Sequence, residues 1–449
     1  MIAKYFFRLT LAAASMVFTC LMAQTAAPSA PKTLRVDYYH TGTAETEFFG
    51  LDRIVLEPLD WPGNVQKAID DSNLGEYFFE VTDLASGKPI YSRGFCSIFA
   101  EWATTAEAKE MARTFSESLR FPMPSAAAQV TLKKRDAQNK FVQVWSFSLD
   151  PSDIFIDRSK TVPPSPLVAF QKSGESPNKV DLLVLGDGYT LEERGKFEKD
   201  AARLLEKIFA TEPFKAHKDD FNVWGLCPAS QKSGIARPSD KVRRRSALGF
   251  SFDALGLSRY VLSYDNRAIM DAAAHAPWEF MIVLANNREY GGGGIFRLYA
   301  VSTADNPASP MVIVHEFAHH FTGIADEYYL SPVAYLPTAP TVEPWEPNIT
   351  IDPINPKWKD LILPSTPLPT PWKKDEFEAA MSGRGPRQNI RSLLEPDKNT
   401  IGSFEGANYA KKGWYRSQVE CIMFETATNE SEFCAACKKA IADMIKNYL

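Results

Sequence analysis

The sequence predicts an α+β protein in which an all-β, sandwich-like domain precedes a domain of alternating strands and helices. Residues 24 to about 160 show no helical periodicity but contain short β-rich runs, such as Thr33 to Tyr39 and Phe141 to Ser148. Turns such as Ser86-Gly87-Lys88-Pro89 separate these runs. From residue 179 onward, apolar strands alternate with amphipathic helical segments. A length of 449 residues also favours two domains.

The first 23 residues are typical of a cleaved secretory signal. Lys4 and Arg8 precede an apolar run that ends at Ala23-Gln24. The alternative is a lipoprotein anchored through Cys20, but Val17-Phe18-Thr19 is a poor acylation signal. No later segment of the sequence approaches the ~20 apolar residues that a membrane helix needs. We therefore expect an exported protein that is periplasmic, attached to the cell surface or secreted.

The proline-rich stretch Pro163-Pro164-Ser165-Pro166 indicates a linker between the two domains. The expected organisation is a signal peptide at 1–23, a β-sandwich domain at 24–160, a linker at 161–178 and a second domain at 179–449. The β-sandwich domain contains no constellation of catalytic residue types, so it holds substrate, docks to the second domain or supports folding. A net charge of -5 argues against a nucleic-acid partner.

The second domain begins in the order strand, helix, strand. The apolar run Leu182 to Leu185 predicts the first strand, and Thr190-Leu191-Glu192-Glu193 has the spelling of a capping box. The helix after it has an apolar face formed by Phe197, Leu204, Leu205 and Ile208. Further strands are expected at Phe221 to Leu226, Phe280 to Ala285 and Ile295 to Ser302.

Four consecutive glycines, residues 291–294, lie directly before the last of these strands. They lack the following lysine and helix of a phosphate-binding loop, so nucleotide binding is not expected. They would let a neighbouring backbone approach the edge of the sheet, where an extended peptide could add as a strand. A flexible hairpin is the alternative.

The stretch His315-Glu316-Phe317-Ala318-His319 has the HExxH spelling of a zinc hydrolase. On a helix, two histidines four residues apart project from one face with a carboxylate beside them. Ser309 can cap the helix, Pro310 suits the first helical position, and Gly323 can adopt the left-handed conformation past the end. A helix from about 310 to 322 is therefore expected. The same spelling can also form a structural metal site.

A catalytic zinc takes three protein ligands and keeps a fourth position for water, so a third ligand must come from outside this helix. Asp326 is favoured because it comes first in the acidic pair after Gly323, and Glu327 is the alternative. The predicted metal ligands are His315, His319 and Asp326, and the predicted catalytic residue is Glu316.

With these residues the chain resembles the bacterial IgA-specific metallopeptidase (IgA peptidase) family, metzincin-like zinc proteases that share His-Glu-x-x-His followed by Ala-Asp-Glu-Tyr. The likeness also includes Val180 to Thr190, Tyr290 to Ile295 and Cys421-Ile422-Met423. It implies a zincin/metzincin-like catalytic domain with Met423 in the tight turn beneath the metal. Thr322 and Ala325 occupy the places of the metzincin glycine and third ligand, so glycine and aspartate each come one residue late.

The predicted function is that of an exported zinc-dependent endopeptidase. Zinc lowers the pKa of its bound water toward ~7 and polarises the scissile carbonyl, while Glu316 takes the water proton and passes it to the leaving amine. The substrate is a protein or peptide, such as an immunoglobulin or another host glycoprotein. Two alternatives stay open: a catalytically silent surface binding protein with a structural zinc site, and a zinc amidase acting on cell-wall peptides.

Several other side chains receive supporting roles. His320 points about 100 degrees away from His319 on a helical wheel, so it is expected in the core or behind a ligand. Tyr415 or Tyr409, upstream of Met423, is a candidate donor to the oxyanion, with an ordinary packed tyrosine as the alternative.

Five cysteines follow the signal segment, an odd number for an oxidising compartment: Cys96, Cys227, Cys421, Cys434 and Cys437. Cys434-Ala-Ala-Cys437 would suit a zinc or redox site, but there is no second Cys-x-x-Cys pair. A disulfide from Cys421 to Cys434 or Cys437 is expected instead, because it would fasten the turn at Met423 to the last helix.

Overall fold

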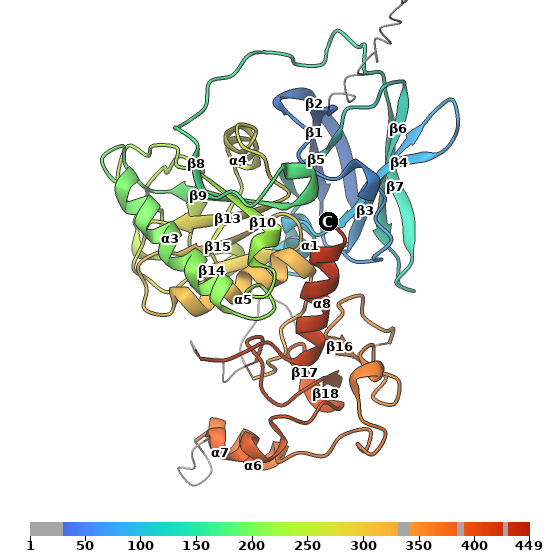
Figure 1. Cartoon of the computed structure of the whole chain (residues 1–449), viewed down its shortest axis with the longest axis vertical. Coiled ribbons are helices and arrows are strands. Elements are labelled where there is room, and N and C mark those ends of the chain that lie inside the picture. Colours follow the sequence, from blue (N-terminus) through green and yellow to red (C-terminus); the bar gives the residue numbers. More distant parts are fainter. Residues whose placement is uncertain (1–29, 331–340, 384–389, 425–429) are drawn as a thin grey trace, which may run out of the picture. The chain divides into compact units, whose positions relative to one another are not determined.

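Two antiparallel sheets form the first part of the chain in the computed structural model, which describes residues 30–330, 341–383, 390–424 and 430–449 (Figure 1). Their orders are β2-β1-β5 and β4-β3-β6-β7. The strands are β1 (Lys32–Gly42), β2 (Glu47–Asp60), β3 (Tyr77–Asp83), β4 (Pro89–Phe95), β5 (Arg113–Pro122), β6 (Ala128–Arg135) and β7 (Phe141–Leu149). The apolar faces of both sheets meet in one core, which includes Val36, Phe121, Phe79 and Val130.

This sandwich-like arrangement follows from period-2 alternation, since β3 and β5 bury alternate residues. It is not purely β, because two short helices, α1 (Ile98–Ala103) and α2 (Ala106–Glu110), lie between β4 and β5. The predicted signal peptide at 1–23 lies outside the described residues. None of the helices in the described ranges is long and apolar enough to cross a membrane.

A mixed sheet of order β14-β15-β13-β9-β10-β8 forms the centre of the second part. Its strands are β8 (Val168–Gln171), β9 (Val180–Asp187), β10 (Phe221–Leu226), β13 (Phe280–Ala285), β14 (Gly292–Ile295) and β15 (Tyr299–Thr303). The four inner strands are parallel, and β8 and β14 pair antiparallel at the two edges. All eight residues of β9 are buried, as expected for a parallel strand covered on both faces.

The strands predicted at Leu182 to Leu185, Phe221 to Leu226 and Phe280 to Ala285 are present. The single strand predicted from Ile295 to Ser302 is wrong, because β14 and β15 form a hairpin there. Its turn contains Arg297 with φ 56°, a left-handed conformation that a non-glycine residue rarely adopts.

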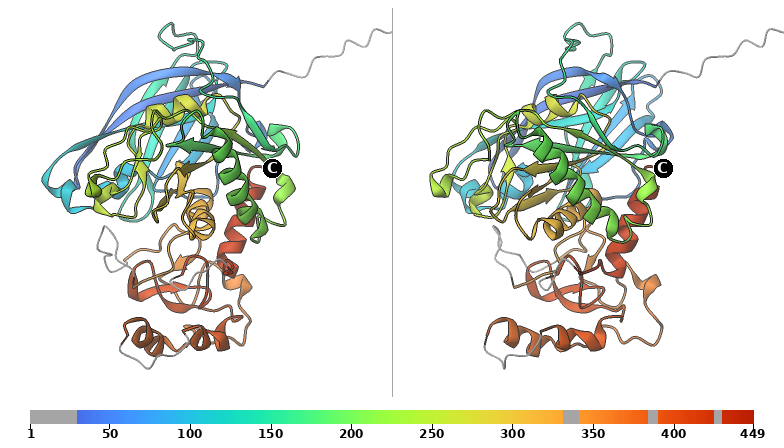
Figure 2. Two further views of the ribbon diagram at one scale, coloured as in Figure 1. Left: turned by 90° about the vertical axis from the view of Figure 1, so that its left-hand side faces the viewer. Right: turned by 60° about the vertical axis from the view of Figure 1, so that its left-hand side comes forward.

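Helices cover both faces of this sheet. One face packs against α3 (Arg194–Ala210) and α5 (Ser309–Thr322), and α8 (Ala435–Lys446) joins the same core. The other face packs against α4 (Asn266–Ala273) and side chains of α1. The apolar face predicted for α3 is buried. Both views of Figure 2 show α3 and α5 on the same side of the sheet.

The described segments between α5 and α8 lie on the side of α5 away from the six-stranded sheet (Figure 2). They form a small sheet of order β16-β18-β17 and two helices. Their bounds are β16 (Ile349–Thr350), α6 (Lys374–Met381), α7 (Ile390–Leu394), β17 (Phe404–Ala407) and β18 (Ala410–Arg416). Earlier in the chain, β11 (Phe250–Ser251) and β12 (Leu262–Ser263) form a separate two-stranded sheet.

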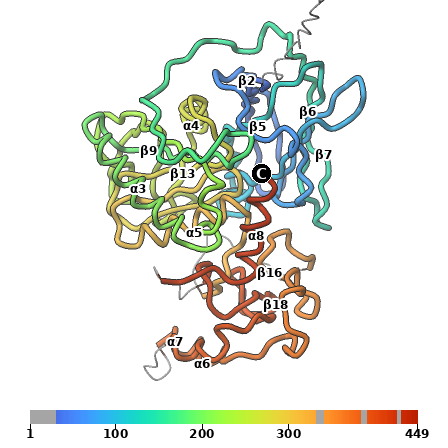
Figure 3. The backbone as a smooth tube through the Cα atoms, in the orientation of Figure 1, coloured from blue at the N-terminus to red at the C-terminus, as the bar shows by residue number. Residues whose placement is uncertain are grey.

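The first two sheets are tied to the second part of the chain by polar contacts. Arg35 in β1 donates to Asp271 of α4 at 2.5 Å, and Arg297 forms an ion pair with Asp70. At the end of α8, the Leu449 carbonyl accepts from Asn64, and Figure 3 shows the red C-terminus beside the first sheets. Residues Pro31–Leu449 accordingly form one compact unit.

Candidate metal centre and active site

The helix α5 begins and ends close to the predicted positions. Pro310 lies in its first turn, and Gly323 ends it in the left-handed conformation with φ 66°. The N-cap is Ala308 rather than Ser309, because the Ser309 hydroxyl donates to the carbonyl of Thr303 instead. The helix therefore buries an apolar face that includes Phe317 and Ala318 and leaves His315, Glu316 and His319 on the other face.

The glycines of β14 let α5 pack directly on the edge of the sheet. A Cβ atom at Gly294 would lie 2.3 Å from the carbonyl oxygen of Glu316, and one at Gly292 would lie 2.7 Å from Val312 Cγ1. The neighbouring segment that packs closely against these glycines is thus the motif helix α5 itself. The edge strand and Glu316 are held in contact as a consequence.

Three of the predicted site residues converge on one point. The Nε2 atoms of His315 and His319 lie 3.1 Å apart, and Asp326 Oδ1 lies 3.1 Å from the first and 3.2 Å from the second. A carboxylate oxygen of Glu316 lies within 4.8 Å of ligand nitrogens on both histidines. Asp326 reaches them because the chain turns back after Gly323.

Backbone carbonyls fix the orientation of both imidazoles. His315 Nδ1 lies 3.2 Å from the carbonyl oxygen of Ile422, and His319 Nδ1 lies 2.6 Å from that of Ile324. A carbonyl can only accept, so Nδ1 carries the proton in each neutral ring and Nε2 presents a lone pair. Two lone pairs and a carboxylate oxygen therefore face one another.

The charges of this group are strongly coupled. Burial alone would lower the pKa of His319, but the Asp326 carboxylate outweighs it and raises that pKa to about 9. Burial would raise the pKa of Asp326, yet the two imidazoles hold it well below its usual range. For Glu316, burial dominates and raises the pKa of the carboxyl. A raised pKa suits a carboxylate that must both accept and donate a proton.

The turn Cys421–Phe424, about 100 residues after the motif in sequence, supports the site. The Phe424 amide donates to the Cys421 carbonyl at 3.0 Å. Met423 is fully buried in the core that also contains α5. Its carbonyl accepts from the amide of Glu327 at 2.8 Å, while Ile422 contacts His315 as described. The turn thus links one histidine to the segment that carries Asp326.

Of the two tyrosines predicted as oxyanion donors, only Tyr409 lies in the site. Its hydroxyl donates to Asp326 Oδ2, and it occupies the tip of the β17–β18 hairpin with φ 59°. Tyr415 is not among the residues that line the cleft. Sequence reasoning missed Tyr328, whose ring stacks on His315 with centroids 6.2 Å apart. Its place directly after the acidic pair was the available signal.

The site opens into a cleft of about 1700 Å³, the space at its mouth included. Besides the motif and β14, its walls include Cys96 and Glu101 from the first part of the chain, and Trp345 from the segment after α5. Burial raises the pKa of Glu101 to about 7, and its carboxylate accepts from Tyr260 at 2.5 Å. No local sequence pattern pointed to Cys96 or Glu101, because long-range packing brings them here.

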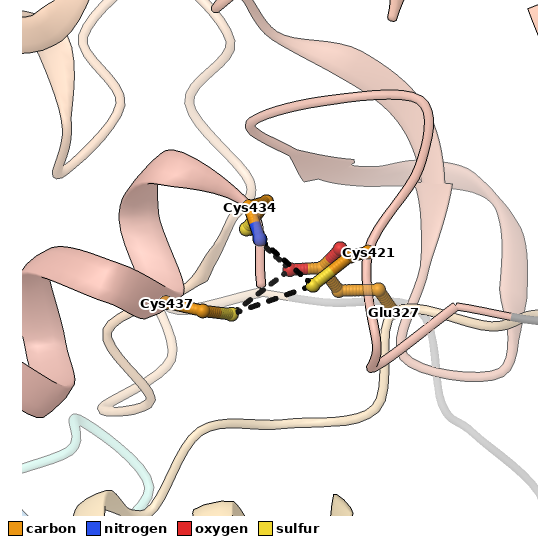
Figure 4. Close-up of side chains that lie close together, drawn as sticks. All are labelled: Glu327, Cys421, Cys434 and Cys437. Atoms are coloured by element: carbon orange, nitrogen blue, oxygen red, sulfur yellow. Dashed lines mark hydrogen bonds between the residues drawn. The ribbon is translucent and has the colours of Figure 1, made fainter. Parts of the chain in front are cut away.

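The remaining candidates face away from this cleft or lie elsewhere. His320 turns to the sheet, where Nε2 accepts from the Met281 amide and Nδ1 donates to the Ile295 carbonyl. Burial lowers the pKa of His320 to about 3. Glu327, the alternative third ligand, points instead at the cysteines near the C-terminus (Figure 4).

The predicted disulfide is wrong for the described part of the chain, where all five cysteines are free. The Sγ atoms of Cys421 and Cys437 lie 3.9 Å apart, compared with about 2.05 Å in a disulfide. Cys434 and Cys437 both contact Glu327, a side chain that the prediction had not placed near them.

Comparison with known proteins gives two family matches. Residues 168–400 and 387–445 match the model described as IgA Peptidase M64, and residues 26–146 match the Peptidase M64 N-terminus. No curated protein matches the chain. The two matches agree with an N-terminal domain followed by a peptidase domain, and together they span most of the sequence. The chain belongs to the IgA Peptidase M64 family and is a peptidase.

Proposed function

We propose that the protein is an exported zinc-dependent endopeptidase with a metzincin-like catalytic domain, in which Glu316 is the general base and acid. The observation that carries this proposal is the convergence of His315, His319 and Asp326 beside Glu316 at the floor of a cleft. Parallel strands with an antiparallel edge strand next to the motif helix support the fold assignment. Export rests on the leader-like residues 1–23.

The donor set fits zinc. Ligands about 2.1 Å from one ion in a tetrahedral arrangement lie about 3.4 Å apart. The three facing atoms of His315, His319 and Asp326 are separated by 3.1 to 3.2 Å. In the neutral rings neither Nε2 atom carries a proton, so both can bind a metal ion. A bound zinc ion would polarise the scissile carbonyl and acidify a water molecule.

The chain's own residues supply the proton transfers. The Glu316 carboxylate lies beside the histidines, and burial raises its pKa, which makes it a stronger base toward a water proton. It then delivers that proton to the leaving amine nitrogen. The backbone contact between Glu316 and Gly294 fixes the helix turn from which this carboxylate projects.

Tyr409 is the proposed hydrogen-bond donor to the developing oxyanion. Its hydroxyl is directed at the ligand group, where it donates to Asp326, and its ring lies edge-on to Tyr328 with centroids 5.2 Å apart. Asn408 and Tyr409 both have positive φ, as the two central residues of a two-residue β-hairpin turn require. The tight hairpin tip therefore presents the phenol to the cleft.

An extended substrate is proposed to pair with β14 at a single residue. Gly292 already exchanges hydrogen bonds with Arg259 and Val261, and the Phe296 carbonyl accepts from Cys96. By alternation along the strand, the amide and carbonyl of Gly294 point to the same side, between these two contacts. A substrate backbone would dock there, next to Glu316.

The open cleft favours a peptidase over a binding protein with a structural zinc site, because a structural site is closed by four protein ligands.

Incubation of the mature chain and its Glu316→Gln variant with immunoglobulin A, other glycoproteins, a peptide library and cell-wall peptides tests the proposal. Cleavage of proteins or peptides by the parent alone supports an endopeptidase. Cleavage confined to cell-wall peptides identifies an amidase, and equal cleavage by both forms contradicts the role of Glu316.

A further inference from the structure

A second group of metal-ligating side chains lies outside the catalytic cleft. It consists of Glu327, Cys421, Cys434 and Cys437, whose ligand atoms all lie within 4.8 Å of one another (Figure 4). Each of the four residues is buried. They come from three segments: the stretch after α5, the turn at Cys421 and the start of α8.

The spacing of these atoms is that of a tetrahedral thiolate site. Sulfur atoms bound at about 2.3 Å to one ion are about 3.8 Å apart, and a sulfur and an oxygen ligand are about 3.5 Å apart. Cys421 and Cys437 Sγ are 3.9 Å apart, and Glu327 Oε1 lies 3.2 Å from Cys434 Sγ and 3.4 Å from Cys437 Sγ. One ion could therefore contact all four atoms with little movement.

The surroundings also suit anionic ligands. The Cys434 amide donates to Cys421 Sγ at 3.2 Å, and Cys434 is the N-cap of the twelve-residue helix α8, whose positive end faces the group. Burial raises the pKa of the Glu327 carboxyl, and the positive charge of the fully buried Arg416 partly offsets this effect.

A polar atom in this group lacks a partner. Asn348 and the two thiols contact Glu327 Oε1, but Oε2 is buried and has no hydrogen-bond partner within the residues that the structure describes. A buried carboxylate oxygen without a partner is costly, and a cation would remove that cost. A disulfide would pair two cysteines and leave both the third thiol and this oxygen unsatisfied.

We propose that Glu327, Cys421, Cys434 and Cys437 bind a structural zinc ion, distinct from the catalytic one. Three thiolates and one carboxylate in a tetrahedral, closed site select zinc over hard cations. The ion joins the segment that carries Asp326, the turn whose Ile422 carbonyl orients His315, and α8. It holds the Asp326 segment and the turn at Ile422 in place. Binding of this ion does not depend on the peptidase activity.

The test uses a His315→Ala/His319→Ala variant of the mature chain, which removes the catalytic ligands and leaves the second group intact. Zinc content by mass spectrometry and zinc-edge X-ray absorption are measured on the purified protein. One zinc per chain with a sulfur-rich coordination shell is expected. No zinc, a shell of nitrogen and oxygen alone, or an intact mass about 2 Da low from a disulfide would overturn the proposal.

A second variant tests the role of Glu327 as a ligand directly. Glu327→Gln retains all three thiols and the side-chain size, and release of zinc to a chromogenic chelator is followed in the same double-alanine background. Release at least about tenfold faster than from that background is expected. Cys227→Ser, which removes a buried cysteine outside the group, should leave the release rate unchanged. Equal rates for the Glu327→Gln and Cys227→Ser proteins would exclude Glu327 as a ligand.

Discussion

Asp326 and Glu327 are neighbours in sequence, but their carboxylates face two different clusters. Asp326 Oδ1 lies 3.1 Å from His315 Nε2, whereas Glu327 Oε1 lies 3.2 Å from Cys434 Sγ. A single extended segment therefore contributes one carboxylate to each cluster, because successive side chains of an extended chain point to opposite sides.

Substitutions at these two neighbours should separate the two clusters. Asp326→Asn is expected to lower the zinc affinity of the histidine site by more than the 10- to 100-fold typical of outer-shell changes, because it removes a charged ligand. Glu327→Gln leaves His315, His319 and Asp326 intact and should lower that affinity much less, at most by the 10- to 100-fold of an outer-shell change. Competition with a chromogenic chelator measures both. Equal losses in the two variants would contradict the division.

Tyr409→Phe should lower kcat by about 10² to 10³ with little change in KM, as expected when one donor to an oxyanion is removed. Zinc content must be measured as well, because Tyr409 also bonds Asp326. Tyr415→Phe is the matched control and should behave like the parent, since Tyr415 does not line the cleft. The assignment fails if the two variants have the same kcat.

Gly294→Ala should destabilise the protein by about 3 kcal/mol or more, because the new methyl group would lie 2.3 Å from a backbone oxygen that cannot move alone. Gly195→Ala in α3 is the control. A Cβ there meets nothing within 4 Å, so alanine should leave stability unchanged or raise it by up to about 1 kcal/mol. Urea unfolding measures both, and similar stabilities would refute the close packing of α5 on β14.

Arg35 is fully buried between Asp37 and Glu57, with Asp271 of α4 as a third partner. Arg35→Met should lower the free energy of unfolding by about 3 kcal/mol, because it leaves carboxylates buried without this partner. Arg53 shares Asp37 and Asp271 but is 27% exposed, so Arg53→Met should cost under about 1 kcal/mol. Chemical unfolding at pH 7 compares them, and equal costs would count against burial as the cause.

The ion pair between Asp70 and Arg297 should make stability depend on pH in acid. Burial alone would raise the pKa of Asp70, but the Arg297 guanidinium outweighs it and holds that pKa well below the usual range. A lowered folded-state pKa stabilises above the unfolded value of about 3.9, and the contribution is lost as pH falls below it.

The stability difference between the parent and Asp70→Asn should therefore be constant from pH 7 to about 5 and shrink toward pH 3. Urea unfolding at a series of pH values measures this difference. A gap that stays the same down to pH 3 would show that the ionised Asp70 does not provide the stabilisation.

Much of the site could be predicted from sequence because its signals are local. The four-residue spacing of His315 and His319, the glycine at 323 and the acidic pair all lie within twelve residues of one another. Helix α5 likewise followed from Pro310 and Gly323 at its ends, and three inner strands followed from short apolar runs. The family resemblance seen in these motifs is confirmed by the matches over both parts of the chain.

The errors arose where long-range contacts decide the structure. The hairpin at Arg297 has no glycine or asparagine in its turn, so the apolar residues on both sides of the turn form one run in the sequence, and that run predicts a single strand. The cysteine cluster could not be predicted because only the fold brings Glu327, 107 residues before Cys434, beside Cys434 and Cys437. Cys96 and Glu101 reach the cleft only through packing between segments about 200 residues apart.

The most direct test of the central claim is zinc content and protein cleavage measured on the same preparations of the parent and Glu316→Ala. The account predicts equal zinc content in both proteins and cleavage by the parent alone, with the loss in the variant amounting to at least about 10²-fold. Cleavage by Glu316→Ala at the parent rate, or a parent without zinc that still cleaves, would contradict it.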